Sequence, residues 1–249
     1  MSWILRPLIL FLVLCTFFVS STSARGLEIR RNDINPAYLV YEGKPVFAYG
    51  PSPQNILTYL PHGKGNKLTD WVELAIRFSI NNFRSYPPSI RVPDTAEDLF
   101  MRSTVDPNKF DLNLFNDRYF KELRKACMLL RKHGMIVHLQ LWQAVIWRAA
   151  WQDCYYNPIN NVNPEISRNA GPGEFVTLKN QALLEHQKRY VEKILDFTAD
   201  LGNVFYDIMN EIGNGTGTSE RWVYEIIKAI NRWEENHSID VLLTLNDEG

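Results

Sequence analysis

An amide and a carboxylate that follow a largely apolar segment are the strongest chemical signal in the sequence. Residues 204–209 have the pattern of a buried strand, and Asn210 and Glu211 come directly after it. A glutamate at a pocket rim can have its pKa raised and can then protonate the leaving oxygen of a glycoside. An adjacent asparagine can hold the sugar 2-hydroxyl. The pair alone also fits a helix N-cap with a first-turn acid, so its strand context carries the prediction that Glu211 is catalytic and Asn210 binds substrate.

Other predicted strands also end in side chains that could bind a polyhydroxylated ligand. Ligands in parallel α/β folds lie at the C-terminal ends of the strands. Arg84 lies in the second predicted strand, and Gln140 and Trp142 lie at the end of the third. We therefore expect all three to bind substrate. A structural ion pair is the alternative for Arg84, and His138, within the third strand, is expected to be a core histidine.

Aromatic residues are concentrated after the third predicted strand. They could stack on the apolar faces of sugar rings, or they could fill a small core beneath a long loop. We expect about half of them to be core, and Trp142, nearest the strand end, to be the sugar platform. The residues concerned are Trp142, Trp147, Trp151, Tyr155 and Tyr156.

Strands and helices alternate along the chain, and this alternation predicts a parallel α/β sheet. A hairpin at 38–49 leads into a first buried strand at 45–49, and long loops are expected at 87–114 and 142–173. One helix is expected to begin at an N-cap, Thr69, and another at Asn116. The first of these is expected to bury Trp71, Leu74, Ala75 and Phe78. Further strands are predicted at 82–86, 135–141, 204–209 and 240–245, and helices at 69–79, 117–133, 174–201 and 219–237.

Five strands and four helices fit either an open five-stranded sheet or the first part of a barrel. A (β/α)8 barrel would need three more strands. A nucleotide-binding sheet is disfavoured because no glycine-rich phosphate loop follows the first strand. We expect residues 25–249 to form one domain, since no linker or low-complexity segment divides them.

The N-terminus has the pattern of a secretory signal at 1–24. Arg6 precedes an apolar run at 8–19, and Thr22-Ser23-Ala24 offers small residues for cleavage. The run is shorter than the roughly 18 apolar residues that a membrane span needs. We therefore expect an extracellular or periplasmic protein, with no stable membrane insertion once the signal is cleaved.

Charge and cysteine content exclude several classes of partner. The formal net charge is −1, which gives no sign of a nucleic-acid partner. Cys127 and Cys154 remain after signal cleavage; they could form a disulfide, but two separate free thiols are favoured because one lies mid-helix and the other in a loop. Metal ligands at short spacing are absent from the sequence, and no metal or cofactor is expected. The two sequons, at Asn214 and Asn236, matter only in a eukaryotic source.

The segment 203–211 resembles the fourth-strand motif of clan A glycoside hydrolases, especially the cellulase-like relatives of family 5. Arg84, within Asn81-Asn82-Phe83-Arg84, resembles the second-strand arginine of that clan. The resemblance covers nearly all of the chain after residue 24, and further matching segments lie at 110–120, 134–141 and 157–163.

This resemblance implies a (β/α)8 barrel that hydrolyses O-glycosidic bonds of an oligo- or polysaccharide with retention and without a cofactor. It implies Glu211 as the acid/base and a nucleophilic glutamate at the end of a seventh strand, which the 249 residues do not include. The chain is thus expected to be the N-terminal part of a catalytic domain. Asp247 and Glu248 are expected to be ordinary loop acids. The alternative function is a non-catalytic carbohydrate-binding protein or an inactive half-barrel.

Overall fold

The computed structural model describes seven stretches of the chain, and the structural statements below concern these residues. They are 29–35, 38–50, 68–85, 97–143, 150–171, 173–210 and 220–245. The predicted signal at 1–24, Trp147, Glu211, Asn214, Asp247 and Glu248 lie outside them.

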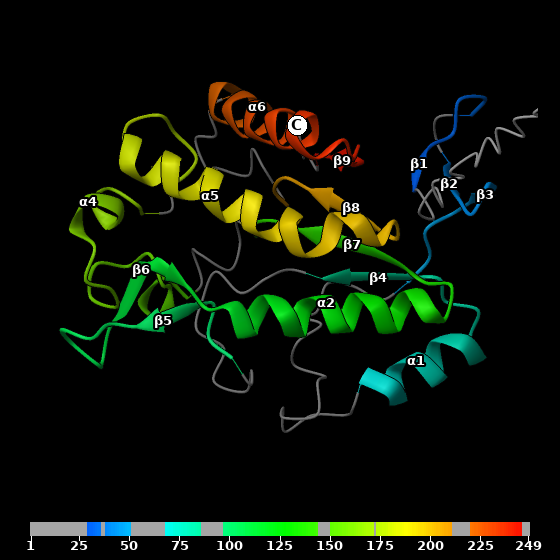
Figure 1. Ribbon diagram of the computed structural model, residues 1–249, viewed down its shortest axis with the longest axis horizontal. Coiled ribbons are helices and arrows are strands. Elements are labelled where there is room, and N and C mark those ends of the chain that lie inside the picture. The colour runs from blue at the N-terminus through cyan, green and yellow to red at the C-terminus, as the bar shows by residue number, and fades with distance from the viewer. Residues whose placement is uncertain are drawn as a thin grey trace, which may run out of the picture.

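A parallel sheet forms the centre of the described part, and its strand order follows the order of the chain (Figure 1). Strands of a barrel succeed one another in this way, whereas a doubly wound sheet reverses its order at a switch point. The predicted barrel-type fold is therefore confirmed for this consecutive part of the sheet. The strands are β4 (Asn82–Ser85), β7 (Ile136–Gln140), β8 (Val204–Asp207) and β9 (Leu243–Thr244).

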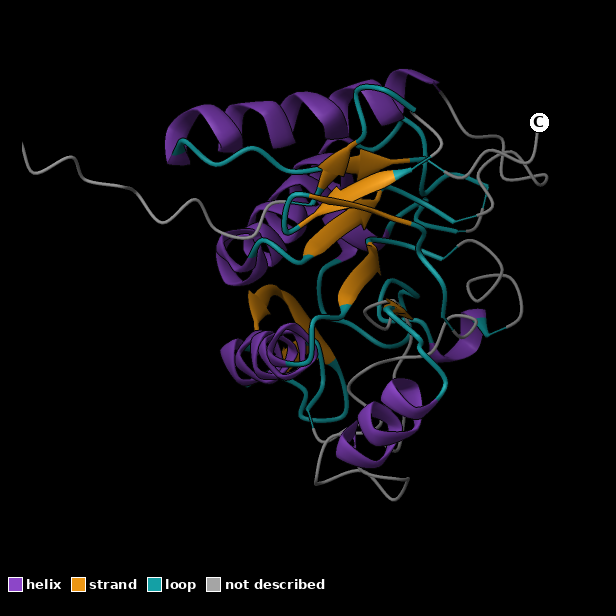
Figure 2. Ribbon diagram, turned by 90° about the vertical axis from the view of Figure 1, so that its right-hand side faces the viewer, coloured by secondary structure: helices purple, strands orange, loops and turns teal. Residues whose placement is uncertain are grey.

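Helices connect these strands and lie together on one face of the sheet (Figure 2). Alternate strand residues, such as Val137, Leu139 and Tyr206, join the core beneath them. The side chain of Asn116 accepts a hydrogen bond from the backbone N–H of Arg118, which confirms the predicted N-cap. The helices are α2 (Asp117–Lys132), α5 (Gln181–Thr198), followed by the short η3 (Ala199–Leu201), and α6 (Glu220–His237).

The opposite face of the sheet is covered at the N-terminal ends of the strands by an antiparallel hairpin. Ile29 and Tyr41 pack there against Ile136 and Phe205. The turn at 42–43 has positive φ at both residues, 51° and 75°, as in the two-residue turns that suit β-hairpins. The predicted hairpin is thus confirmed. Its strands are β2 (Leu39–Tyr41) and β3 (Lys44–Val46), and β1 (Arg30–Arg31) pairs antiparallel with β2 to complete a three-stranded sheet.

The predicted first buried strand at 45–49 is wrong. Residues 47–50 run beside the start of β4, where the carbonyl of Tyr49 accepts from the N–H groups of Asn81 and Asn82, 3.0 Å from each. Phe47 is nevertheless 66% exposed and Tyr49 59% exposed. Contact with β4 on one side is not enough to bury these large side chains.

The first helix, α1 (Leu68–Arg77), buries a different stripe from the predicted one. Leu74 and Phe78 are exposed, and Thr69 lies inside the helix rather than at its N-cap. Apolar residues occur on several sides of this segment, so two overlapping stripes fit the sequence. Packing against the core selects the one formed by Leu68, Val72 and Ala75.

The described part of the predicted loop at 87–114 contains most of an antiparallel pair, β5 (Phe100–Arg102) and β6 (Phe110–Phe115). This pair lies at the end of the molecule opposite the N-terminal hairpin (Figure 1). Its aromatic residues cover part of the segment that follows β7. Phe100 and Phe110 both contact the ring of Tyr155, at centroid distances of 5.3 and 4.7 Å.

Residues 150–171 and 173–180 have little regular structure. Two short helices occur, η2 (Trp151–Asp153) and α4 (Pro164–Ser167). Asparagine side chains support the backbone: that of Asn161 donates to the carbonyl of Tyr155, and that of Asn163 accepts from the N–H of Leu112 at 2.7 Å. The next helix, α5, begins after its N-cap Asn180 rather than at the predicted residue 174.

His186 lies in the aromatic cluster under this segment and makes a pH-dependent contribution to stability. Burial lowers the pKa of His186 to about 3, with Arg189 adding to the effect. Between the ordinary histidine pKa near 6.5 and pH 3, the unfolded chain binds a proton at this side chain and the folded chain does not. The free energy of unfolding therefore falls as the pH is lowered through this range. In the variant His186→Phe, we expect the loss of unfolding free energy between pH 7 and pH 4 to shrink by about 3 kcal/mol.

Urea denaturation at pH 7 and pH 4 measures the unfolding free energy of each protein. The substitution also removes the contact between His186 and the hydroxyl of Tyr156, 3.2 Å away. Comparing the change in unfolding free energy between the two pH values cancels the part of this loss that does not depend on pH. The control is the same substitution at an exposed helix end, His133→Phe, with which the pH dependence of His186→Phe is compared. Equal pH dependence in wild type and His186→Phe would contradict the prediction.

Candidate active site

Two of the predicted site residues meet at the C-terminal edge of the parallel sheet. The guanidinium Nη2 of Arg84, on β4, donates to Oδ1 of Asn210, which follows β8. The side-chain nitrogen of Asn210 donates in turn to Oε1 of Gln143 at 2.6 Å. Residues from three strand ends, 126 positions apart at the extremes, thus share one hydrogen-bonded chain.

Backbone pairing between the ends of β7 and β8 positions this chain. Gln140 is opposite Asp207, and the same offset recurs in an isolated bridge between Gln143 and Asn210. The N–H of Asn210 donates to the carbonyl of Trp142 at 3.1 Å. Asn210 is 2% exposed and Gln143 6% exposed, so their amide–amide bond is largely shielded from water.

Arg84 is half-buried and makes no ion pair with any residue that the structure describes. Its one hydrogen bond to a described side chain goes to Asn210, and its Nε has no partner there. The predicted alternative of a structural ion pair therefore has no carboxylate to form it within the described residues. A cation at the sheet edge can interact with a negative charge that lies or develops nearby.

Gln140 is completely buried, and its position corrects the predicted contact with substrate. Its side-chain nitrogen donates to Oδ2 of Asp207 at 3.0 Å. His138 Nε2 lies 3.5 Å from the same oxygen, and the imidazole stacks on Phe205 with ring centroids 4.5 Å apart. Gln140, Asp207 and His138 therefore form a polar layer inside the sheet, consistent with His138 as a core residue.

Trp142 is also a core residue in this structure, which corrects its predicted role as a sugar platform. Its side chain is 1% exposed, and its ring lies 5.3 Å from that of Trp222 and 5.4 Å from that of Tyr190. Tyr155 and Tyr156 are equally buried, so the small core beneath the loop is confirmed for these residues. The backbone of Trp142, rather than its ring, contacts the candidate site, because its carbonyl accepts a hydrogen bond from the N–H of Asn210.

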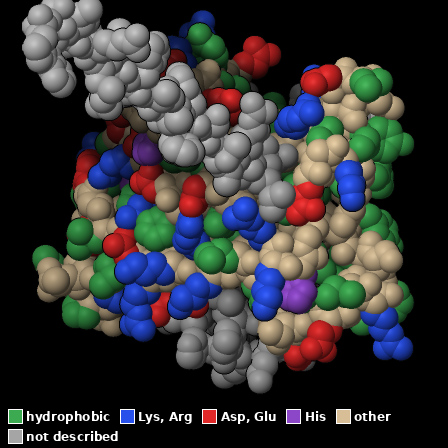
Figure 3. Space-filling model, turned by 45° about the vertical axis from the view of Figure 1, so that its right-hand side comes forward, with side chains coloured by type: hydrophobic (Ala, Val, Ile, Leu, Met, Phe, Trp, Pro, Cys, Tyr) green, Lys and Arg blue, Asp and Glu red, His purple; other side chains and the backbone are tan. Residues whose placement is uncertain are grey.

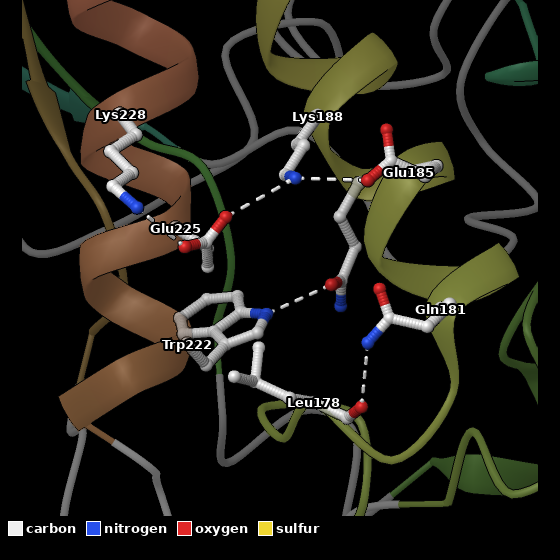
Figure 4. A network of polar contacts seen from close by, with 8 residues as sticks. Leu178, Gln181, Glu185, Lys188, Trp222, Glu225 and Lys228 are labelled. Atoms are coloured by element: carbon white, nitrogen blue, oxygen red, sulfur yellow. Dashed lines mark hydrogen bonds and ion pairs between the residues drawn. The ribbon is translucent and has the colours of Figure 1, made fainter.

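Polar contacts between α5 and α6 fix the helix that begins after residues 211–219 (Figure 4). The indole N–H of Trp222, in the first turn of α6, donates to Oε1 of Gln187 at 2.8 Å. Lys188 bridges Glu185 and Glu225 at 2.9 and 3.4 Å with its side chain only 15% exposed. The start of α6 is therefore held both by these contacts and by the packing of Trp222 on Trp142.

Glu211 lies outside the described residues, and its relation to the site is given by its place in the chain, directly after Asn210. Gln143 was present in the sequence as the residue after Trp142, but it was not predicted as a site residue. The signal that could have found it is its position, just beyond the end of a buried strand.

Cysteine and metal chemistry gain no support from the described residues. Cys127 and Cys154 are both buried and are not joined to each other by a disulfide, which confirms the favoured prediction of two separate thiols. Burial raises the pKa of Cys127 to about 12, so this thiol stays protonated near neutral pH. Among the described residues no cluster of three or more His, Cys, Asp or Glu side chains could hold a metal ion.

The surface and the helices add two observations about partners. Positive and negative side chains are mixed over the face shown in Figure 3. Across the part of the chain that the structure describes, no helix combines the length and the apolar character that crossing a bilayer requires.

Comparison with solved structures identifies the fold. The chain superposes on the endo-1,4-beta-mannanase from Rhizomucor miehei with a TM-score of 0.56 at 13% identity, covering 89% of this chain and 61% of that one. The glycoside hydrolase family 5 mannosidase of the same organism gives a TM-score of 0.57 at 14% identity and coverages of 90% and 56%. A protein from Bacteroides vulgatus ATCC 8482, provisionally classed as a glycoside hydrolase, gives 0.57 at 14% identity and coverages of 90% and 39%.

These similarities show that the chain has the fold of part of a family 5 glycoside hydrolase barrel. They confirm the fold that the resemblance around Asn210 implied. The chain spans about two fifths to three fifths of the length of these three proteins. No protein-family model matches the sequence, and no curated protein matches it.

Proposed function

We propose that this chain is the acid/base-bearing part of a glycoside hydrolase that cleaves O-glycosidic bonds. The observation that carries the proposal is the hydrogen-bonded chain from Arg84 through Asn210 to Gln143 at the C-terminal edge of the sheet. Active sites of (β/α)8 enzymes lie at this edge. Glu211 is the next residue after Asn210 in the sequence.

The proposed reaction assigns one task to each of three residues. Glu211 protonates the leaving glycosidic oxygen and then activates a water molecule. Asn210 binds the hydroxyl beside the reacting carbon, where a hydrogen bond strengthens in the transition state. Arg84, which has no ion pair among the described residues, stabilises the second carboxylate that retaining hydrolysis requires about 5 to 5.5 Å from the first. We propose that this second carboxylate is supplied by another strand of the complete barrel.

Mannose-containing oligosaccharides are the substrates we propose to test first. Two of the similar structures are named as a mannanase and a mannosidase. A mutant of that mannosidase was solved in complex with mannosyl-fructose. The proposed location is extracellular or periplasmic, because residues 1–24 have the pattern of a cleaved signal.

Replacing Glu211 by glutamine should abolish most of the hydrolysis, because glutamine cannot transfer the proton. We expect kcat for manno-oligosaccharides to fall by about 10²- to 10⁴-fold in the full-length protein. In Glu211→Ala, azide should restore turnover of an aryl mannoside that has a good leaving group, because the small anion replaces the activated water. The product should be a mannosyl azide.

The matched control is Glu220→Gln, an exposed glutamate in the first turn of α6, which should leave kcat unchanged. Undiminished turnover in Glu211→Gln would refute the assignment of the acid/base. If the wild-type protein binds mannotriose in calorimetry but hydrolyses none of the sugars offered, the carbohydrate-binding alternative replaces the enzyme.

A further inference from the structure

The amide of Asn210 is held in one orientation by partners on both sides. Arg84 can only donate hydrogen bonds, so the atom of Asn210 that faces it must be the oxygen. The amide nitrogen then points the other way, where Gln143 presents its own oxygen at 2.6 Å. The donor-only character of arginine thus assigns both amides without ambiguity.

From this geometry we infer that Gln143 is a positioning residue, which fixes the Asn210 amide by accepting its N–H. The inference deepens the proposed function, because Asn210 is the residue proposed to bind the sugar hydroxyl. Gln143 acts through Asn210 and is not itself assigned a contact with the reacting atoms.

Gln143 is suited to this task because its backbone is held against that of Asn210. The bridge between the two residues sets their separation, and both side chains are almost completely buried. In such surroundings hydrogen bonds are stronger than in water, and successive bonds polarise one another. The positive charge of Arg84 at one end of the chain increases this polarisation.

A second partner restricts the tilt of the amide more closely than one hydrogen bond can. The terminal torsion of an asparagine side chain is broad, so one hydrogen bond to Arg84 does not fix the plane of the amide. A second hydrogen bond, on the opposite edge of the amide, fixes this plane. A fixed amide is already in place when a sugar hydroxyl arrives, and no reorganisation is needed during the reaction.

Two variants of similar volume separate acceptance from simple packing. Gln143→Glu keeps an oxygen that can accept from Asn210, whereas Gln143→Met fills the space without an acceptor. The first readout is the exchange with solvent of the side-chain amide hydrogens of Asn210, followed by NMR in the free protein. We expect exchange to rise roughly three- to tenfold in Gln143→Met and to stay within about twofold of wild type in Gln143→Glu.

The second readout is the affinity for β-1,4-linked mannotriose. We expect Gln143→Glu to bind it nearly as tightly as the wild type and Gln143→Met to bind it more weakly. If both variants keep slow exchange, Gln143 only packs and the inference is overturned. If Gln143→Glu exchanges as fast as Gln143→Met, an accepting oxygen is not what matters, and the inference is again overturned. Exchange in the predicted order without mannotriose binding would leave the positioning role standing and refute the proposed substrate.

The control is Gln152→Met, the same change at an exposed position on η2, which should alter neither readout. Thermal unfolding of each variant shows whether the fold is retained. Should Gln143→Met not fold, Gln143→Leu replaces it as the variant without an acceptor, and the same two outcomes decide.

Discussion

Replacing Trp142 by alanine is expected to lower the free energy of unfolding by about 3–5 kcal/mol. The indole is 1% exposed and lies among Phe175, Tyr190 and Trp222, so its removal leaves a cavity that rigid aromatic neighbours cannot fill. Trp222 is affected directly, because it packs on Trp142 at the start of α6. Urea denaturation followed by circular dichroism measures the loss.

Two further variants distinguish a core tryptophan from a sugar platform. Trp142→Phe should lower the free energy of unfolding less than Trp142→Ala, because the phenyl ring fills part of the cavity. Trp151→Ala replaces a partly exposed tryptophan on η2 and should lower the free energy of unfolding clearly less than Trp142→Ala does. If Trp142→Ala instead keeps wild-type stability and loses only affinity for mannotriose, the ring faces a sugar and the core assignment is wrong.

The fold could be predicted from the sequence because its signals are local and repeated. Helical spacing of apolar residues and the N-cap at Asn116 located α2, and glycine at positive φ after the helix, Gly134, marked its end. The chain order of the parallel strands agrees with the general rule that strands consecutive along the chain tend to be neighbours in a sheet. Local signals of this kind survive in the folded state because the tertiary contacts agree with them.

The roles of Gln140 and Trp142 could not be predicted in this way. Both lie near the end of a strand, where a side chain can point to a ligand or into the core with the same local sequence. Partners far along the chain decide the outcome: Asp207 binds Gln140, and Trp222 packs on Trp142. The hairpin of β5 and β6 was missed for a related reason, since its aromatic residues pack against residues 155–156, which are distant in the sequence.

Arg84 and Asn210 are the predicted site residues that the structure brings together, and the sequence held a partial signal for this. Each was placed at a strand end, but only the sheet register brings them into contact across 126 positions. Gln143 completes the group from a third strand end. A site assembled from several strand ends can be predicted residue by residue, whereas the hydrogen bonds between its members require the fold.

Replacing Arg84 by methionine is expected to separate activity from stability. Loss of the guanidinium removes a preorganised charge from the proposed site, so kcat/KM for manno-oligosaccharides should fall by about 10²- to 10³-fold. The free energy of unfolding should fall by only about 1 kcal/mol, because one hydrogen bond is lost and methionine keeps most of the packing of the aliphatic stem. The control is Arg118→Met, a mostly exposed arginine paired with Glu97, which should change neither quantity appreciably.

The size of the stability change decides between the two roles considered for Arg84. Removing one partner of a buried ion pair costs about 3–5 kcal/mol, because an uncompensated charge is left behind. A loss of that size in Arg84→Met, with activity reduced only in proportion to the unfolded fraction, would reveal a structural ion pair with a group outside the described residues. A large loss of kcat/KM with a small loss of stability requires instead that the guanidinium acts on the reacting groups. Arg84→Lys should then recover little activity, since its single ammonium cannot reproduce the planar fork that reaches Asn210.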